Sequence, residues 1–271
     1  MKFCYIFIAC LLMTATTVYS QDCSLLAKNY KLKEGDTISY QLYSGKGLKL
    51  EELHVGHADS IRNVVCINGG KKVDSIGSAR FSSIQFTAEK HGQNFLAFEF
   101  TGESLEVPSD EIGALVKTKK TAAIDSATTE EAEETDEFAM GTEYIAAPHF
   151  SVKALTCTEG NSGKFYEAKL NQQLEIVLSQ SPYKLQYGDD LTGAVLFLGK
   201  PIAGIAVKVF VKSMGDNVYQ NEYHTDDEGR FFFKLNRSGN WLIQTAYARA
   251  SKAEKSDSDY DYWQSSFSFG F

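Results

Sequence analysis

Long runs of this chain alternate apolar and polar residues one by one. In "IAVKVFVK", residues 205–212, every second position is apolar, beginning with Ile205. A strand places successive side chains on opposite faces, whereas a helix repeats about every 3.6 residues. The pattern therefore predicts a half-buried strand, and the same period of two recurs along most of the chain.

Short turn sequences separate the alternating runs. Beyond residue 172 the predicted strands cover 173–179, 191–199, 205–212, 218–225, 231–235, 241–248 and 265–271. Between them lie "SMGDN", "DDEGR" and "RSGN", which are rich in residues that tolerate turn dihedrals. About seven short strands at this spacing are typical of an immunoglobulin-like sandwich. Runs such as "TISYQLYSG" and "NFLAFEFTG" extend the prediction to residues 22–116.

One seven-residue frame, Tyr-Lys-Leu-x-x-Gly-Asp, occurs twice. It appears as "YKLKEGDTI" at residues 30–38 and as "YKLQYGDDL" at residues 183–191. In both places a Leu precedes a tight Gly-Asp turn, and an alternating strand follows. The repeat predicts the same structural corner in two related sandwiches, although a chance repeat of so short a frame is the alternative.

These patterns predict an all-β protein with two immunoglobulin-like β-sandwich domains joined by an acidic, low-complexity insertion. The insertion contains "KTKKTAAIDSATTEEAEETDEF", which has almost no large apolar residues to offset the entropy of ordering it. The predicted segments are a signal peptide (1–20), an N-terminal β-sandwich (21–116), an acidic linker or insertion (117–140), bridging strands (141–171) and a C-terminal immunoglobulin-like β-sandwich (172–271).

The first twenty residues predict export. A single charge at Lys2 precedes an apolar run from Phe3 to Met13, and small or polar residues lead to a cleavage point before Gln21. The apolar run is shorter than the ~20 residues that a membrane-spanning helix needs. We therefore expect an exported protein with no transmembrane segment after signal cleavage. The periplasm is the expected compartment, with an extracellular or cell-surface location as the alternative.

The charge and cysteine content exclude two classes of protein. The formal net charge is −8 and becomes −9 when Lys2 is removed with the signal peptide. Without a cluster of Lys and Arg, such a chain does not fit nucleic acid. Three cysteines remain after cleavage, an odd count that permits one disulfide with one thiol left over, so the chain is no disulfide scaffold. The sequence leaves all three pairings open among Cys23, Cys66 and Cys157.

The C-terminal half carries a family resemblance. The order "SPYKLQYGDDLTGAVLFLGKPIAGIAVKVFV", "TDDEGRFFFKLNRSGNWLIQTAY" and "YDYWQSSFSF" resembles an exported bacterial family of unassigned function with an immunoglobulin-like or transthyretin-like C-terminal domain. That family is related to periplasmic proteins associated with nickel and cobalt uptake. The resemblance implies a histidine after Gly-x-Trp, but this chain has Ala246 and Tyr247 there.

A Thr-Asp-x-x-Gly turn precedes the Phe-rich strand. Thr225, Asp226 and Gly229 are expected to shape this hairpin, with the Asp226 carboxylate accepting backbone N–H groups inside the turn. Asp226, Asp227 and Glu228 also suggest a calcium loop. The turn is favoured, because a calcium loop needs more oxygen ligands at regular spacing.

Two clusters are candidate metal sites. "HVGHAD" places two imidazoles and a carboxylate within six residues, but positions i and i+3 of a regular strand face opposite sides. A bulge at Gly56 would bring them together, and solvent-facing histidines are the alternative. The carboxylates of "EKSDSDYDYW" could hold a hard cation, with a solvated loop as the alternative. No cofactor is required, and a bound divalent metal ion is one option. The candidate ligands are His54, His57 and Asp59, and Asp257, Asp259 and Asp261.

Common enzyme signatures are missing from the sequence. It has no Gly-x-Ser-x-Gly, His-Glu-x-x-His, Gly-x-x-x-x-Gly-Lys or Cys-x-x-Cys motif. We therefore expect a non-catalytic periplasmic binding or accessory protein. The resemblance implies nickel or cobalt uptake as its context, and a membrane transporter or another envelope protein as its partner. The alternative is a structural or adhesive cell-envelope protein that assembles through sandwich edges or loops.

Overall fold

The computed structural model describes most of the chain beyond the predicted signal peptide. The described residues are 22–45, 48, 51–53, 61–73, 83–89, 91–117, 141–159, 162–251 and 257–271. The signal peptide and nearly all of the acidic insertion lie outside them. Within these ranges, no helix has both the length and the apolar character needed to cross a membrane.

The largest element of the described chain is a ten-stranded sheet. Its strands are β2 (Lys31–Leu32), β5 (Ile61–Asn68), β6 (Lys71–Lys72), β8 (Gly92–Thr101), β9 (Leu105–Pro108), β10 (Glu143–Thr158), β14 (Ala206–Ser213), β15 (Val218–His224), β17 (Gly239–Ala250) and β18 (Tyr260–Gly270). Their order is β15-β14-β17-β18-β10-β8-β5-β6, and β2 and β9 also pair with β10. We call this the central sheet.

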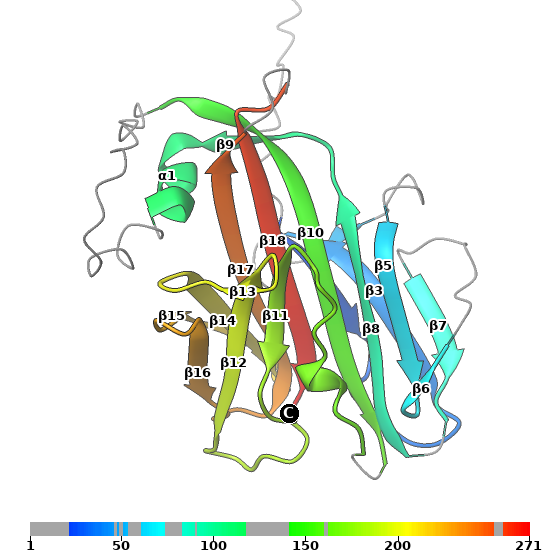
Figure 1. Cartoon of the computed structure of the whole chain (residues 1–271). Helices are drawn as coiled ribbons and strands as arrows, with labels where there is room; N and C mark the ends of the chain where they lie inside the picture. The colour runs from blue at the N-terminus through cyan, green and yellow to red at the C-terminus, as the bar shows by residue number, and fades with distance from the viewer. Residues whose placement is uncertain are drawn as a thin grey trace, which may run out of the picture.

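Two four-stranded sheets cover the central sheet (Figure 1). The first cover sheet contains β1 (Cys23–Ala27), β3 (Thr37–Ser44), β4 (Glu51–Glu52) and β7 (Ser83–Thr87). The second contains β11 (Leu174–Leu178), β12 (Asp190–Phe197), β13 (Lys200–Pro201) and β16 (Arg230–Lys234). Along β18, Tyr262 belongs to the core beneath the first cover sheet, whereas Trp263 belongs to the core beneath the second. Because neighbouring residues of a strand face opposite sides, the cover sheets lie on opposite faces. The predicted all-β sandwich class is confirmed.

The two sandwiches meet at a parallel pair of strands. Residues 146–154 of β10 pair with residues 260–268 of β18. The segment 141–171, predicted to hold bridging strands, supplies β10. Both halves of the chain therefore share one continuous sheet, and nearly every residue of β18 is buried.

The strand pairing shows an internal duplication. β3 pairs with β7 through residues 37–41, with β1 through 40–44 and with β4 through 43–44. β12 pairs with β16 through residues 190–194, with β11 through 193–197 and with β13 through 196–197. Every position in β12 lies 153 residues after its counterpart in β3 (190 against 37, 197 against 44). The two cover sheets therefore have the same topology and the same register.

The repeated seven-residue frame forms equivalent corners in the two halves. Asp36 Oδ2 accepts a hydrogen bond from Lys33 N at 2.8 Å, and Asp189 Oδ2 accepts one from Gln186 N at 2.7 Å. In both corners the Asp carboxylate thus closes a turn that leads into the middle strand of a cover sheet. The structure supports the interpretation of the repeat as one corner used twice.

The Thr-Asp-x-x-Gly hairpin also has the expected geometry. Asp226 Oδ1 accepts hydrogen bonds from Glu228 N at 3.0 Å and Arg230 N at 2.8 Å, and Arg230 Nε donates to Asp226 Oδ2 at 3.0 Å. These donors, led by Arg230, lower the pKa of the Asp226 carboxyl group. Because the turn itself occupies both carboxylate oxygens, the contacts favour the turn over the calcium loop.

One helix, α1 (Ser109–Lys117), was not predicted. Asp110 and Glu111 lie in its first turn, where the helix dipole favours negative charge. Ile112 is buried, and Leu115 and Val116 pack against the first core. The apolar face is only one helical turn long, so its period is too short to be recognised in a strand-rich sequence.

The corner glycines provide a test of the duplication. Gly35 has φ +84° and Gly188 has φ +92°, and an added Cβ would meet no atom within 4 Å at either position. Gly35→Ala and Gly188→Ala should each lower the free energy of unfolding by ~1–2 kcal/mol, because only the left-handed backbone conformation opposes alanine. Urea denaturation measures the change. Lys33→Ala and Gln186→Ala, at exposed positions of the same turns, are the matched controls and should stay within about 0.5 kcal/mol of wild type. Equal losses in glycine and control variants would contradict the proposed role of the corners.

Candidate functional site

A polar cleft of about 150 Å³ lies between β5, β8, β10 and the segment that leads into β11. We call it the His149 cleft. It combines ionisable side chains with irregular backbone, which makes it the candidate site. Its lining residues are Arg62, Asn63, Glu99, Phe100, Thr101, His149, Phe150, Asn171 and Gln173.

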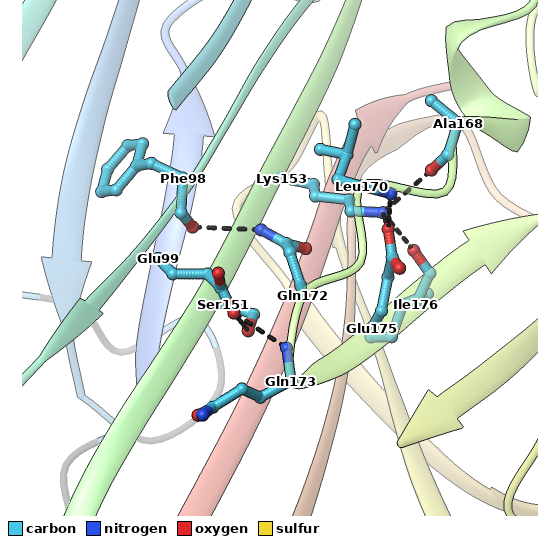
Figure 2. Close-up of polar contacts among 10 residues, drawn as sticks. All are labelled: Phe98, Glu99, Ser151, Lys153, Ala168, Leu170, Gln172, Gln173, Glu175 and Ile176. Atoms are coloured by element: carbon cyan, nitrogen blue, oxygen red, sulfur yellow. Dashed lines mark hydrogen bonds and ion pairs between the residues drawn. The ribbon is translucent and has the colours of Figure 1, made fainter. Parts of the chain in front are cut away.

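Glu99 joins the elements around the cleft. Its Oε1 accepts hydrogen bonds from Gln173 N at 2.8 Å and from Ser151 Oγ at 3.4 Å (Figure 2). Its Oε2 accepts a hydrogen bond from Asn63 Nδ2. One carboxylate on β8 therefore binds groups from β5, β10 and the connecting segment. Through these hydrogen bonds, Glu99 fixes the positions of Asn63, Ser151 and Gln173 around the cleft.

Two asparagines with left-handed backbone lie beside the cleft. Asn63 has φ 53° and Asn171 has φ 57°, a region that few residues other than glycine adopt. The register between β5 and β8 shifts between Arg62 and Val65, so β5 is irregular at this point. Such bulges re-aim side chains and occur often beside active sites. The local backbone therefore holds the exposed Arg62 at the cleft.

His149 is the titratable ring of the cleft. It is half-buried and stacks on Trp263, with ring centroids 5.8 Å apart and planes inclined by 17°. Burial lowers the pKa of His149, and the nearby Arg62 lowers it further, while Asp261 and Glu99 oppose the shift. The imidazole is therefore neutral near pH 7. No described protein group hydrogen-bonds to its ring nitrogens, which leaves them available to a ligand.

Beside the cleft, the same face of β10 carries a buried ion pair (Figure 2). Lys153 Nζ donates to Glu175 Oε1 at 2.7 Å, to Ile176 O at 3.0 Å and to Ala168 O at 3.2 Å. Only 1% of each of the Lys153 and Glu175 side chains is exposed. Burial lowers the pKa of Lys153, and the Glu175 carboxylate opposes that shift. The pair ties β10 to β11 and to the connecting segment.

We call Lys153, Glu175 and the neighbouring Gln172 the polar row. Gln172 Nε2 donates to Phe98 O at 3.2 Å and so satisfies a carbonyl of β8. Gln172 Oε1 and Glu175 Oε2 are buried and have no hydrogen-bond partner among the described protein atoms. Buried polar groups without partners oppose folding. The row is therefore held in place by the surrounding strands rather than by its own contacts alone.

The histidine cluster predicted from "HVGHAD" lies outside the described residues, so it stays a prediction. It comprises His54, His57 and Asp59.

The structure gives the acidic candidates near the C-terminus different surroundings. Asp259 Oδ2 accepts a hydrogen bond from Ile145 N at 2.8 Å, and Asp261 Oδ2 lies 3.8 Å from Arg249 Nη2. Asp257 is exposed in the preceding loop. Across the described ranges, no group of three His, Cys, Asp or Glu side chains is arranged to hold a metal ion. These contacts therefore give no support to a cation site at Asp257, Asp259 and Asp261.

The three cysteines beyond the predicted signal peptide, Cys23, Cys66 and Cys157, are all buried. Burial raises the pKa of Cys66 to about 11, and the Sγ atom of Cys157 donates to Thr158 O at 3.3 Å. A raised pKa suppresses the thiolate, which is the reactive form. The described contacts therefore do not activate Cys66 as a nucleophile.

The sequence contained one signal for the cleft that pattern reasoning missed. In "PHFSVK", His149, Ser151 and Lys153 alternate with the apolar Pro148, Phe150 and Val152. Alternation places all three on one face of β10. A row of polar side chains on a buried strand marks a place where partners must be supplied from elsewhere.

Comparison with known proteins gives the family. A family model described as "Domain of unknown function (DUF4198)" matches residues 22–249. The chain belongs to the DUF4198 family. A search of curated proteins found no match to this DUF4198 chain. Neither result links it to nickel or cobalt uptake.

Solved structures resemble the DUF4198 chain only distantly. The D0-D1 domain of intimin is 12% identical, with 92% of this chain and 98% of that chain covered and a TM-score of 0.22. A tetra-tandem repeat in the extending region of a large adhesion protein is 9% identical, with 92% and 49% covered and a TM-score of 0.21. Trypsin-activated alpha-2-macroglobulin from Escherichia coli is 10% identical, with 94% and 16% covered and a TM-score of 0.21. Scores this low support no conclusion about fold or function.

The buried ion pair gives a stability prediction. Lys153→Met should lower the free energy of unfolding by ~3–5 kcal/mol, because the Glu175 carboxylate would stay buried without its cation. Replacing both residues in a Lys153→Met, Glu175→Leu variant should recover most of that loss. Urea denaturation measures both effects.

An exposed ion pair is the matched control. Lys234 Nζ lies 3.1 Å from Asp190 Oδ1, and both side chains are more than half exposed. Lys234→Met should cost less than about 1 kcal/mol. If Lys153→Met costs no more than Lys234→Met, the buried pair does not hold the second cover sheet.

Proposed function

We propose that this DUF4198 chain is an exported, non-catalytic binding or accessory protein of the cell envelope, and that the His149 cleft binds a small ligand with an anionic group. One observation carries the proposal. The exposed guanidinium of Arg62 lies at the same cleft as the neutral imidazole of His149, whose ring nitrogens have no hydrogen-bond partner among the described residues.

The chemistry of the lining favours a carboxylate ligand. Arg62 offers a planar fork of N–H donors, which matches a carboxylate in two-point geometry. A neutral His149 can add one further donor. The negative charge of Glu99 is offset by donors from Asn63, Ser151 and the backbone of Gln173. The cleft therefore has donor groups for an anion although the whole chain is acidic.

The positions of the possible catalytic groups support a non-catalytic role. Covalent catalysis needs a nucleophile within hydrogen-bond reach of its base. In the described lining, no hydroxyl or thiol hydrogen-bonds to His149, and Glu99 is engaged by three donors. The arrangement suits holding a ligand better than breaking a bond in it.

Transition-metal uptake is the finer form of this proposal. Imidazole nitrogen is a common ligand for nickel and cobalt, and His149 offers one such group. Further ligands would come from the bound small molecule. A membrane transporter or another envelope protein is the partner that such a role requires.

Calorimetry on the purified exported protein tests the proposal. Acetate, succinate and citrate are titrated separately, and nickel chloride is titrated in their absence. Arg62→Gln should weaken carboxylate binding by about tenfold or more, because a charged two-point contact is lost. Lys184→Gln removes an exposed charge away from the cleft and should leave binding unchanged. If no carboxylate binds more tightly than the millimolar range, the anion proposal is wrong.

His149→Phe should abolish any nickel binding that depends on the cleft.

The pH dependence separates the two kinds of ligand. Because the pKa of His149 is lowered, the ring is neutral at pH 7 and becomes charged only as the pH falls below about 6.5. Carboxylate affinity should then rise on acidification, since the imidazolium adds a positive charge. Nickel affinity should fall, since the protonated ring has no lone pair for the metal. In His149→Phe both trends should disappear. An unchanged pH profile in this variant would show that His149 is not at the binding site.

A further inference from the structure

Strand β15 is an open edge of the central sheet. Among the described residues it pairs with β14 alone, and it ends the strand order of the sheet. Figure 1 shows it at the rim of the molecule. Six of its seven residues are exposed, and Tyr223 is half-buried. A long exposed edge of this kind can pair with another strand.

The hydrogen bonds around β15 show which backbone groups face outward. Ser213 N donates to Asn217 O at one end, and Thr225 N donates to Ile205 O at the other, each at 3.0 Å. In an antiparallel pair the bonded positions alternate, so the odd-numbered residues bond to β14. The outward N–H and C=O groups belong to Val218, Gln220, Glu222 and His224.

β15 lacks most of the features that usually protect an edge. Such features are proline, charged side chains, lysine above all, a bulge or a very short strand. β15 contains no proline or lysine. Its register against residues 206–212 of β14 is unbroken over all seven positions. Of these protecting features, β15 has one acidic side chain, Glu222.

We infer that β15 pairs with β15 of a second copy of this chain, antiparallel and centred on Asn221. This register uses every outward backbone group, because the even-numbered residues bond to one another across the two-fold axis. In this register, two of the four cross-strand pairs join residues of the same type. The expected cross-strand pairs are Asn221–Asn221, Gln220–Glu222, Tyr219–Tyr223 and Val218–His224.

The charges near β15 fit this self-pairing. The chain is acidic overall, yet β15 has one carboxylate, Glu222, whose register partner on β14 is Lys208. At the hairpin, Lys212 Nζ lies 2.9 Å from Asp216 Oδ1. In the proposed register Glu222 faces a neutral glutamine, so no like charges oppose each other. The edge is locally balanced, and the net charge of the chain acts there only at a distance.

One aromatic side chain of the edge is already held in place. The guanidinium carbon of Arg237 lies 3.7 Å from the centroid of the Tyr219 ring. A fixed ring loses less conformational freedom on association than a mobile one. Pairing would join two central sheets into one continuous sheet and give the assembly two His149 clefts.

A charge pair at position 220 tests the register. The oligomeric state of the purified exported protein is measured by light scattering after size exclusion, and the dissociation constant by analytical ultracentrifugation. Gln220→Glu places like charges opposite Glu222 at two symmetric positions and should raise the dissociation constant by about tenfold. Gln220→Lys places opposite charges there and should leave the dimer intact or tighten it. Equal effects of the two substitutions would show that β15 does not pair in this register.

Proline at the same position tests the backbone contacts. The Gln220 N–H faces away from β14, so Gln220→Pro removes an outward donor and retains the internal pairing. This variant should be monomeric, with an unchanged circular dichroism spectrum. Phe232→Ser, at an exposed position of the second cover sheet, is the control and should remain dimeric. A wild-type protein that is monomeric at every concentration measured would overturn the inference. This holds even if β15 pairs with a different partner.

Discussion

The parallel pairing of β10 with β18 is the contact on which the rest of the structure depends. It joins residues 146–154 to residues 260–268 and so merges the central strands of both sandwiches into one sheet. Parallel pairs are stable mainly where both faces are covered. Here the first cover sheet buries one face and the second buries the other, so each half protects the seam that joins them. Neither half could withdraw without exposing apolar side chains of β18.

The polar row, which consists of Lys153 on β10 with Gln172 and Glu175 beside it, is the exception to this apolar packing. A buried ion pair is seldom more stable than apolar side chains of the same volume, and Gln172 Oε1 and Glu175 Oε2 have no described hydrogen-bond partner. Stability alone therefore gives no reason to keep Lys153 and Glu175. Their contacts fix the segment that leads into β11, and Gln173 on that segment binds Glu99 at the cleft. The row thus exchanges some stability for a fixed geometry beside His149.

Local patterns were sufficient for most strands and insufficient for the site. The alternation in "IAVKVFVK" and the Asp226 turn follow from short-range rules, and the structure agrees with both. The pairing of β10 with β18 joins segments more than a hundred residues apart, and no local pattern specifies it. The cleft depends on the same long-range information, because Glu99 and His149 meet only through the arrangement of β8 beside β10. Arg62 needs in addition a bulge that its sequence does not reveal.

The duplication shows which side chains distinguish the His149 cleft from the corresponding face of the second half. Cys66 pairs with Leu96 in the first core as Val209 pairs with Ile243 in the second. The register can be followed from β8 to β10 in the first half and from β17 to β18 in the second. His149 and Lys153 then correspond to Tyr262 and Ser266. The second half therefore has a phenol and a hydroxyl where the first has an imidazole and an ammonium group. In the second half Gln264 Oε1 accepts the backbone N–H of Cys23, so the start of β1 contacts the corresponding face. The imidazole and the ammonium group thus belong to one copy alone, whereas the cleft beside Gln264 in the other copy is lined by Asp22 and Lys208.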